Sequence, residues 1–395
     1  MVAIVTDVHY RMSLALIRDL AQAGVEVITC EQDRCRDSRT SPALGALSRY
    51  VSRHVWLPGG TDGLEALLSL CRETGLGRDC RPALLPAGAA TLALIAENRE
   101  RFEPLCGLCV PKAEQLDLLN SKPRLAGLAA RLGVPLPESM APGEDLDRFL
   151  DRQGLPCVIK PACGEKLGLT AAARYAVAST REEARAAWER FSRLAGEPPV
   201  VQGYLPGRAL GCSVLARSGQ VMAAICHQRV REYPVSGGPS SCCQCVERED
   251  IRAYAARLTA ETGLTGLAMF EFKEDRDGAP RLLECNPRVW GTFPLTRVSG
   301  SGIPLLWCAL AWNAGNPDNP APLPALTPPR GRRMIFAASD LMAAAGYARR
   351  GSPGRALGTL GDFLNPWVRD GLFEWGDMAP ALAYFRSLLA KERKL

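Results

Sequence analysis

Apolar residues in the first 110 positions alternate between short continuous runs and helical spacing. Residues 2–5 form an apolar run, and residues 12–23 then repeat Leu14, Ile17 and Leu20 along one helical face before Gly24, a frequent helix stop. The same pattern predicts strands at 25–28, 54–57 and 83–85 and helices at 64–72 and 91–100. Strands that alternate with helices form a helix-covered sheet, so we expect an open α/β domain over residues 1–110.

Two common nucleotide sites are missing from this pattern. A dinucleotide site needs a glycine-rich turn after the first strand, but residues 6–11 (TDVHYR) contain no glycine. The phosphate loop GxxxxGK[ST] does not occur in the sequence. The layered fold is therefore expected without a Rossmann cofactor.

The pattern changes after residue 111. It predicts helices at 122–132, 180–194 and 249–261 and strands at 156–160, 199–202, 213–216, 221–227, 267–274 and 281–285. Two antiparallel hairpins are expected, one around residues 218–219 and one around the turn 275–278. The α/β domain is thus followed by an α+β region.

A proline-rich linker and a helical tail make up residues 317–395. The tail carries several Trp, Phe and Leu residues among basic ones. It would either pack on the core as an extra helical layer or contact a membrane as an amphipathic surface.

Composition and charge exclude several classes of protein. Hydrophobic residues make up 47 % of the chain, which is typical of a globular protein. The net charge of +6 is spread along the chain, so we expect no nucleic-acid partner. The N-terminus has no signal-peptide pattern, and the longest apolar stretch, 303–312, is too short to span a membrane. A cytoplasmic protein is expected.

The 15 cysteines include two clusters that resemble metal knuckles, Cys106-x-x-Cys109 and Cys242-Cys243-x-Cys245. Zinc usually takes four ligands from two matched pairs, and neither cluster has a matching pair. Buried reduced thiols are therefore the favoured interpretation.

The second hairpin carries a candidate metal site. Its pairing would bring Glu271 close to Glu284, and Asn286 and Arg288 would share the face of Glu284 because strand side chains repeat every two residues. Two carboxylates and an amide are hard oxygen ligands that suit Mg²⁺, and an arginine suits phosphate. A solvated hairpin with a surface salt bridge is the competing interpretation.

Two lysines add to this chemistry. Lys160 ends an apolar strand, and Lys122 opens a helix. A lysine at the end of a buried strand needs an anionic partner, because an unpaired buried charge is costly. Either lysine alone would equally fit an ordinary surface position.

Five segments, in order and at plausible spacing, resemble the ATP-grasp superfamily. They are 120–122 (NSK), 158–161 (VIKP), 201–207 (VQGYLPG), 270–272 (FEF) and 284–291 (ECNPRVWG). The resemblance covers residues 1–315 and is to the carboxylate–amine ligase branch, related to carbamoyl-phosphate synthetase and biotin carboxylase. It implies a pre-ATP-grasp domain at 1–110, a two-lobed ATP-grasp fold at 111–200 and 201–316, and the tail at 317–395.

The resemblance also implies roles for individual residues. ATP phosphates would contact Lys122 and Lys160, with Lys166 added from the flap at 161–168, and adenine would contact the backbone at Gln202, Gly203 and Leu205. The metal, Mg²⁺ or alternatively Mn²⁺, would take Glu271, Glu284 and Asn286, while Arg288 would steady the transferring phosphate.

Two departures from the family pattern are visible. The flap has only two glycines, and Arg208-Ala209 replaces the acid that often binds ribose. Residues 226–241 resemble the loop that precedes the last helix of this branch. Arg229 and Arg231 alternate there on one strand face, and we expect them to bind the substrate carboxylate and the acyl phosphate.

The predicted function is an ATP-dependent ligase that joins a small carboxylate to an amine through an acyl phosphate, releasing ADP and phosphate. An amino acid or peptide is the expected substrate class, and a homo-oligomer is left open. The alternatives are a carboxylase-type enzyme that uses bicarbonate and a non-catalytic nucleotide-binding regulator.

Overall fold

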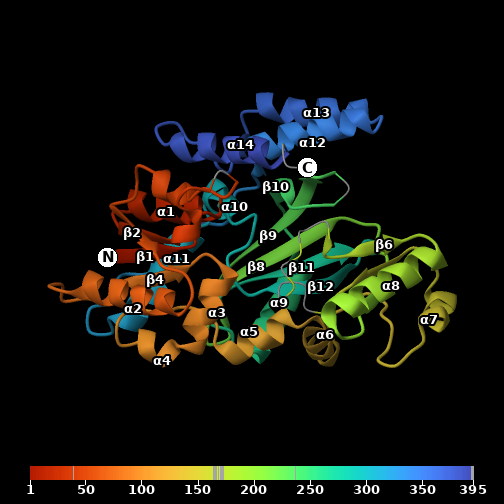
Figure 1. The fold of residues 1–395 in the computed structure, drawn as a ribbon, viewed down its shortest axis with the longest axis horizontal. Helices are drawn as coiled ribbons and strands as arrows, with labels where there is room; N and C mark the ends of the chain where they lie inside the picture. The colour runs from red at the N-terminus through yellow and green to blue at the C-terminus, as the bar shows by residue number, and fades with distance from the viewer. Residues whose placement is uncertain (39, 163–166, 168, 170–172, 236, 393–395) are drawn as a thin grey trace.

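The computed structural model describes residues 1–38, 40–162, 167, 169, 173–235 and 237–392. Three sheets organise the chain: a four-stranded sheet at the N-terminal end, a small three-stranded sheet and a seven-stranded sheet between them (Figure 1). The mixed α/β and α+β fold expected from the sequence is confirmed. No helix of the described part is long and apolar enough to cross a membrane.

The N-terminal sheet is parallel, with the order β3-β2-β1-β4. Its strands are β1 (Val2–Thr6), β2 (Glu26–Gln32), β3 (Arg53–Leu57) and β4 (Ala83–Pro86). The helices between and after them are α1 (Ser13–Gln22), α2 (Thr61–Gly75), α3 (Ala89–Glu97) and α4 (Arg99–Phe102), with short 3-10 turns at Asp33–Cys35 and Leu44–Leu47. The predicted helix at 91–100 is thus two helices, and the chain turns at Asn98.

The small sheet lies on the opposite side of the molecule from the N-terminal sheet (Figure 1). Helices α5 (Ala113–Asn120) and α6 (Lys122–Arg131) lead towards it. It pairs β6 (Ala176–Ala178), β5 (Cys157–Lys160) and β7 (Val200–Gly203) antiparallel, with helices α7 (Leu146–Gln153) and α8 (Arg181–Ala195). The predicted capping box starts α8, because the Thr180 hydroxyl accepts from the Glu183 amide at 3.2 Å.

The large sheet has the order β12-β11-β8-β9-β10-β13-β14. Its strands before the tail are β8 (Ala209–Arg217), β9 (Gln220–Glu232), β10 (Ser240–Cys245), β11 (Gly266–Glu274) and β12 (Pro280–Asn286), with α9 (Glu249–Glu261) after β10. The segment 226–241, expected to resemble a loop, is in large part strand. Residues 226–232 continue β9, which agrees with the predicted position of Arg229 and Arg231 on one strand face, and β10 starts at Ser240.

The tail extends the large sheet and covers one edge of the molecule. Strands β13 (Arg333–Ile335) and β14 (Val368–Asp370) add to β10, so the predicted helical tail also contains strands. Helices α12 (Ala337–Arg349), α13 (Pro353–Leu364) and α14 (Ala379–Glu392) form a layer above both sheets (Figure 1). The tail therefore packs on the core as an extra layer.

The N-terminal sheet and the large sheet share one core. Helix α10 (Pro294–Ser299) and helix α11 (Ile303–Gly315) contribute to it, and α11 packs against β4. A β-carbon on Gly107 would lie 1.9 Å from the Ala311 carbonyl oxygen, so glycine is required at this contact. Trp307 Nε1 donates to the Cys109 carbonyl at 2.7 Å. The predicted domain boundaries stay predictions. The shared core joins the N-terminal sheet to the large sheet.

Candidate active site

The three predicted metal ligands share one face of the β11–β12 hairpin. Glu271 pairs with Glu284 across the two strands, as predicted, because a β-bulge between Glu271 and Phe272 shifts the register by one residue. Asn286, two residues further along β12, donates from Nδ2 to Glu271 Oε1 at 3.1 Å. The structure therefore brings both carboxylates and the amide together.

Both predicted phosphate-binding lysines reach this face from other elements. Lys122, the first residue of α6, places Nζ 3.5 Å from Glu284 Oε2. Lys160, the last residue of β5, is 9 % exposed. Burial lowers the pKa of Lys160 to about 8, and the nearby Lys122 charge acts in the same direction against Glu284 and Glu271.

The pKa values of the two carboxylates are shifted in opposite directions. Burial raises the pKa of Glu271, against the attraction of Arg229, and repulsion by Glu284 raises it further. Burial also acts on Glu284, but Lys122 and Lys160 outweigh it and hold the pKa of Glu284 below its usual value. Glu284 is thus the carboxylate that stays ionised most readily in this site.

Two arginines complete the cluster. Arg229 donates from Nη2 to Glu271 Oε2 at 2.8 Å, and its Nη1 lies 3.5 Å from Glu232 Oε1. Arg288 donates from Nη2 to Asn286 Oδ1 at 2.9 Å. The two carboxylates of the hairpin are therefore surrounded by four cationic groups from β5, β9, α6 and the residues after β12.

Arg231 lies apart from this cluster. Its Nε and Nη2 donate to the two carboxylate oxygens of Asp340 at 2.9 and 2.6 Å, and Nη2 also donates to Asp362 Oδ2 at 2.7 Å. Asp340 and Asp362 belong to tail helices α12 and α13. The structure thus separates Arg231 from Arg229, with which the sequence analysis grouped it.

The predicted adenine-binding segment joins the small sheet to β8. Gln202 donates from Nε2 to Ser139 Oγ at 3.0 Å, and the Gly203 amide donates to the Glu138 carbonyl at 2.8 Å. The Leu205 amide donates to no atom of the described residues, so it is available to a ligand. Lys166 lies outside the described residues.

Arg208 stands where an acid that binds ribose was expected, and its contacts give it a structural role. Arg208 donates to both carboxylate oxygens of Glu274, at 2.6 and 2.7 Å, and Arg248 pairs with the same carboxylate. The arginine in the position of the expected acid therefore anchors the start of β8 to the end of β11.

His227 is a structural residue. It is 2 % exposed, and its Nε2 lies 3.2 Å from the Thr292 hydroxyl. Burial, reinforced by the Arg229 charge, lowers the pKa of His227 to about 3. The imidazole is therefore neutral throughout the physiological range and cannot serve as a proton store for the reaction.

Sequence reasoning missed a histidine–carboxylate pair at the carboxyl ends of β1 and β2. His9 Nδ1 lies 2.6 Å from Glu31 Oε2, and the His9 amide donates to the same oxygen at 2.8 Å. Tyr10 stacks on His9 with ring centroids 4.0 Å apart. Burial raises the pKa of the Tyr10 hydroxyl, as does Asp7, while Arg288 lowers it, so this group adjoins the cluster. The position of residues 7–11 directly after a buried parallel strand was the available signal.

Glu31 also lies close to a cysteine, so three side chains that could each bind a metal ion are grouped here. The ligand atoms of His9, Glu31 and Cys35 lie within 4.8 Å of one another. The hydrogen bonds between His9 and Glu31 already satisfy this carboxylate. These bonds alone explain why the side chains lie together.

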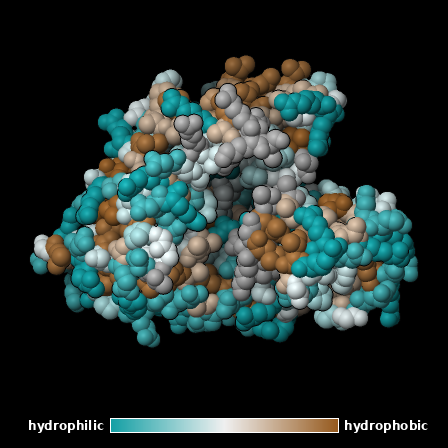
Figure 2. All heavy atoms as spheres, in the orientation of Figure 1, coloured by the Kyte–Doolittle hydropathy of each residue, from teal (hydrophilic) through white to brown (hydrophobic). Residues whose placement is uncertain are grey.

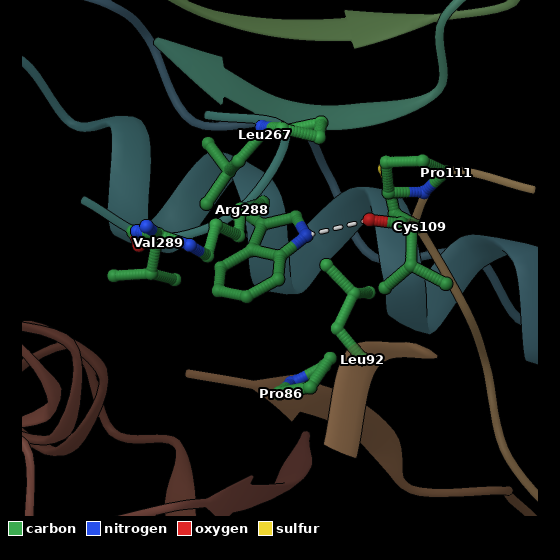
Figure 3. Close-up of a pocket in the computed structure, with 10 residues that line it drawn as sticks. Pro86, Leu92, Cys109, Pro111, Leu267, Arg288 and Val289 are labelled. Carbon is green, nitrogen blue, oxygen red and sulfur yellow. Dashed lines mark hydrogen bonds between the residues drawn. The ribbon is translucent and has the colours of Figure 1, made fainter. Parts of the chain in front are cut away.

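A small pocket of about 10 Å³, room for roughly one water molecule, lies beside Arg288 (Figure 3). Leu92, Cys109, Leu267 and Val289 contribute to its walls. It lies where the N-terminal sheet meets the β11–β12 hairpin, because Pro86 is the last residue of β4 and Leu267 belongs to β11.

The hairpin residues fit a hard divalent cation. Glu271, Glu284 and Asn286 offer only oxygen ligands, on one sheet face, and two of the three are within hydrogen-bond distance of each other. In the structure, the two carboxylates contact cationic side chains and an amide N–H group. A bound metal ion would replace these partners.

Comparison with known proteins supports the same fold. Residues 196–327 match a family model described as ATP-grasp in the biosynthetic pathway with Ter operon. No curated protein matches the sequence. Among solved structures, a biotin carboxylase from Campylobacter jejuni aligns with a TM-score of 0.62 at 16 % identity, over 84 % of this chain and 74 % of that one.

Two further structures are similar. The biotin carboxylase domain of a 2-oxoglutarate carboxylase from Hydrogenobacter thermophilus aligns with a TM-score of 0.61 at 15 % identity, over 84 % of this chain and 72 % of that one. An L-amino acid ligase from Bacillus licheniformis aligns with a TM-score of 0.52 at 17 % identity, over 80 % and 73 %. These likenesses confirm the expected resemblance: the chain has the ATP-grasp fold.

Proposed function

We propose that this protein is an ATP-dependent ligase that joins a carboxylate to an amine through an acyl phosphate. The observation that carries the proposal is the charge of the site. Lys122, Lys160, Arg229 and Arg288 outnumber the carboxylates of Glu271, Glu284 and Glu232 in this cluster, so the site favours an anionic ligand. A nucleoside triphosphate supplies that charge.

Each part of the site has a role in this proposal. The two lysines bind the ATP phosphates, and the Leu205 amide with the segment around Gln202 and Gly203 receives adenine. Glu271, Glu284 and Asn286 hold Mg²⁺ or Mn²⁺, which supplies neutralising charge to the phosphate oxygens. The structures with the same fold include complexes with MgADP and an ATP analogue, which supports this assignment.

The proposed reaction has two steps. A carboxylate oxygen attacks the γ-phosphorus, the bond to the bridging oxygen of ADP breaks, and an acyl phosphate forms. An amine then attacks the acyl carbon, phosphate leaves, and the amine loses a proton to give the amide. Arg288 and Arg229 offset the negative charge that develops on the transferred group.

An amino acid or small peptide is the proposed substrate class. The similarity of the fold to that of an L-amino acid ligase supports it. The biotin carboxylase neighbours support bicarbonate as the second candidate acid.

The test measures ADP and phosphate release with MgATP, pooled amino acids, other small carboxylates and, separately, bicarbonate. Release that requires both an acid and an amine supports the proposal. Release with bicarbonate alone favours the carboxylase chemistry. AMP release would overturn the acyl-phosphate mechanism, and tight ATP binding without turnover in any pool would favour a regulator.

The pKa of Lys160 predicts a pH dependence of ATP binding. A pKa near 8 means that Lys160 is charged below that pH and neutral above it, so the KM for ATP should rise between pH 7 and pH 9. The Lys160→Arg variant keeps its charge over this range, so its KM should vary less. Titration of KM against pH for both proteins checks this, and parallel profiles would contradict it.

A further inference from the structure

The outer face of helix α13 is apolar and uncovered. Leu357, Leu360 and Leu364 are 68 %, 43 % and 88 % exposed, and their spacing places them along one stripe. The opposite face, with Ala356, Thr359 and Asp362, is buried. The helix is therefore anchored by one side while it presents leucine to solvent on the other.

The apolar surface continues beyond the helix. Phe363 is 40 % exposed, and Trp367, just before β14, is 74 % exposed. Figure 2 shows hydrophobic side chains along the upper edge of the molecule, where Figure 1 places α13. An apolar surface of this kind on a folded chain marks an interaction site.

The exposed charged residues of the chain segment that carries this surface are all positive. Between residues 337 and 370 the exposed charged residues are Arg349, Arg350, Arg355 and Arg369, and none forms a salt bridge within the part of the chain that the structure describes. The acidic residues of the same segment point inward. Asp340 and Asp362 bind Arg231, and Asp370 accepts from the backbone amides of Ala337 and Leu372.

We propose that this tail surface, formed by the three leucines of α13, Phe363, Trp367 and the four arginines, docks on an anionic lipid membrane. Leucine and aromatic side chains enter the boundary between headgroups and acyl chains, where tryptophan is favoured. Arginine is attracted to anionic headgroups. The two features that such a surface needs thus come from one segment of the chain, residues 337–370.

A second copy of the chain fits this surface less well. A two-fold interface places a surface against itself, so the four arginines of each copy would find no exposed carboxylate of residues 337–370 on the other copy to pair with. An anionic membrane meets the same arginines with opposite charge. The proposal does not depend on the proposed ligase activity.

Co-sedimentation of the full chain with vesicles tests the proposal. We expect binding to vesicles of phosphatidylcholine with one-third phosphatidylglycerol, weaker binding in high salt, and no binding to phosphatidylcholine alone. The double variant Leu357→Glu, Leu364→Glu should bind at least about tenfold more weakly than the parent protein. The double variant Arg349→Gln, Arg355→Gln should lose about 30-fold in binding, because it removes two positive charges.

Leu76→Glu is the matched control, because Leu76 is 69 % exposed after α2 in the N-terminal domain. It should bind vesicles like the parent protein, and all variants should keep the parent unfolding midpoint, since the changed side chains are exposed. Equal binding to both vesicle types would overturn the proposal. So would a concentration-dependent dimer that ignores vesicles and dissociates in the leucine double variant, because that result assigns the surface to a second copy.

Discussion

Replacing Glu284 by glutamine should reduce the kcat for ATP-dependent turnover roughly a thousandfold. The change keeps the size of the side chain and removes its negative charge. Glu284 lies 3.5 Å from Lys122 Nζ and is the carboxylate whose pKa is held low, so it is the ionised oxygen ligand of the proposed metal site. Binding of ATP itself should persist, because all four cationic groups remain.

The matched control for this variant is Asp277→Asn, the same chemical change in the exposed turn of the same hairpin. It should retain the parent kcat. Steady-state release of ADP and ATP binding by calorimetry measure the two quantities separately. A Glu284→Gln protein with the parent kcat would remove Glu284 from the proposed metal site.

Replacing Arg231 by alanine should lower the free energy of unfolding by about 3–5 kcal/mol. The guanidinium joins β9 to two tail helices through Asp340 and Asp362, and Asp340 is fully buried. Removal of the arginine leaves a buried carboxylate without its cation, although the Ser241 hydroxyl still donates to it at 2.8 Å. Denaturant unfolding gives the stability, and limited proteolysis reports whether the tail is released.

Arg333→Ala is the control for this second effect. Arg333 shares Asp362 with Arg231, is more exposed and also pairs with the Gln244 side chain, so its loss should cost about 1 kcal/mol or less. A stable Arg231→Ala protein that has lost turnover would give Arg231 the substrate role that its spacing from Arg229 suggests. Loss of stability with turnover retained in the folded fraction supports the role in positioning the tail.

Local sequence patterns were sufficient for the hairpin that carries the proposed metal ligands. The turn at 275–278 places Phe272 opposite Leu282, and a β-bulge between Glu271 and Phe272 then shifts the register by one residue, so that Glu271 faces Glu284. The sequence predicts the hairpin, and the bulge completes the pairing of the two carboxylates. In residues 226–241 the predicted alternation of Arg229 and Arg231 on a strand face agrees with the position of both residues in β9.

Other contacts of the predicted residues depend on positions far away in the chain. Arg231 meets partners 109 and 131 positions away, and His9 meets Glu31 22 positions away across two parallel strands. Strands β13 and β14 have three residues each, too few for a periodic signal. No spacing rule along the chain connects such pairs.

The sequence by itself determined the helix-covered N-terminal sheet, the β11–β12 hairpin and the ATP-grasp resemblance, because hydrophobic periodicity and turn residues act over short stretches. Only the tertiary structure decided that Arg229 joins the site while Arg231 anchors the tail, and that the leucines of α13 remain uncovered. Those outcomes depend on which surfaces the whole chain buries. Side chains two residues apart on one strand then acquire different partners, because the elements that pack over them come from different parts of the chain.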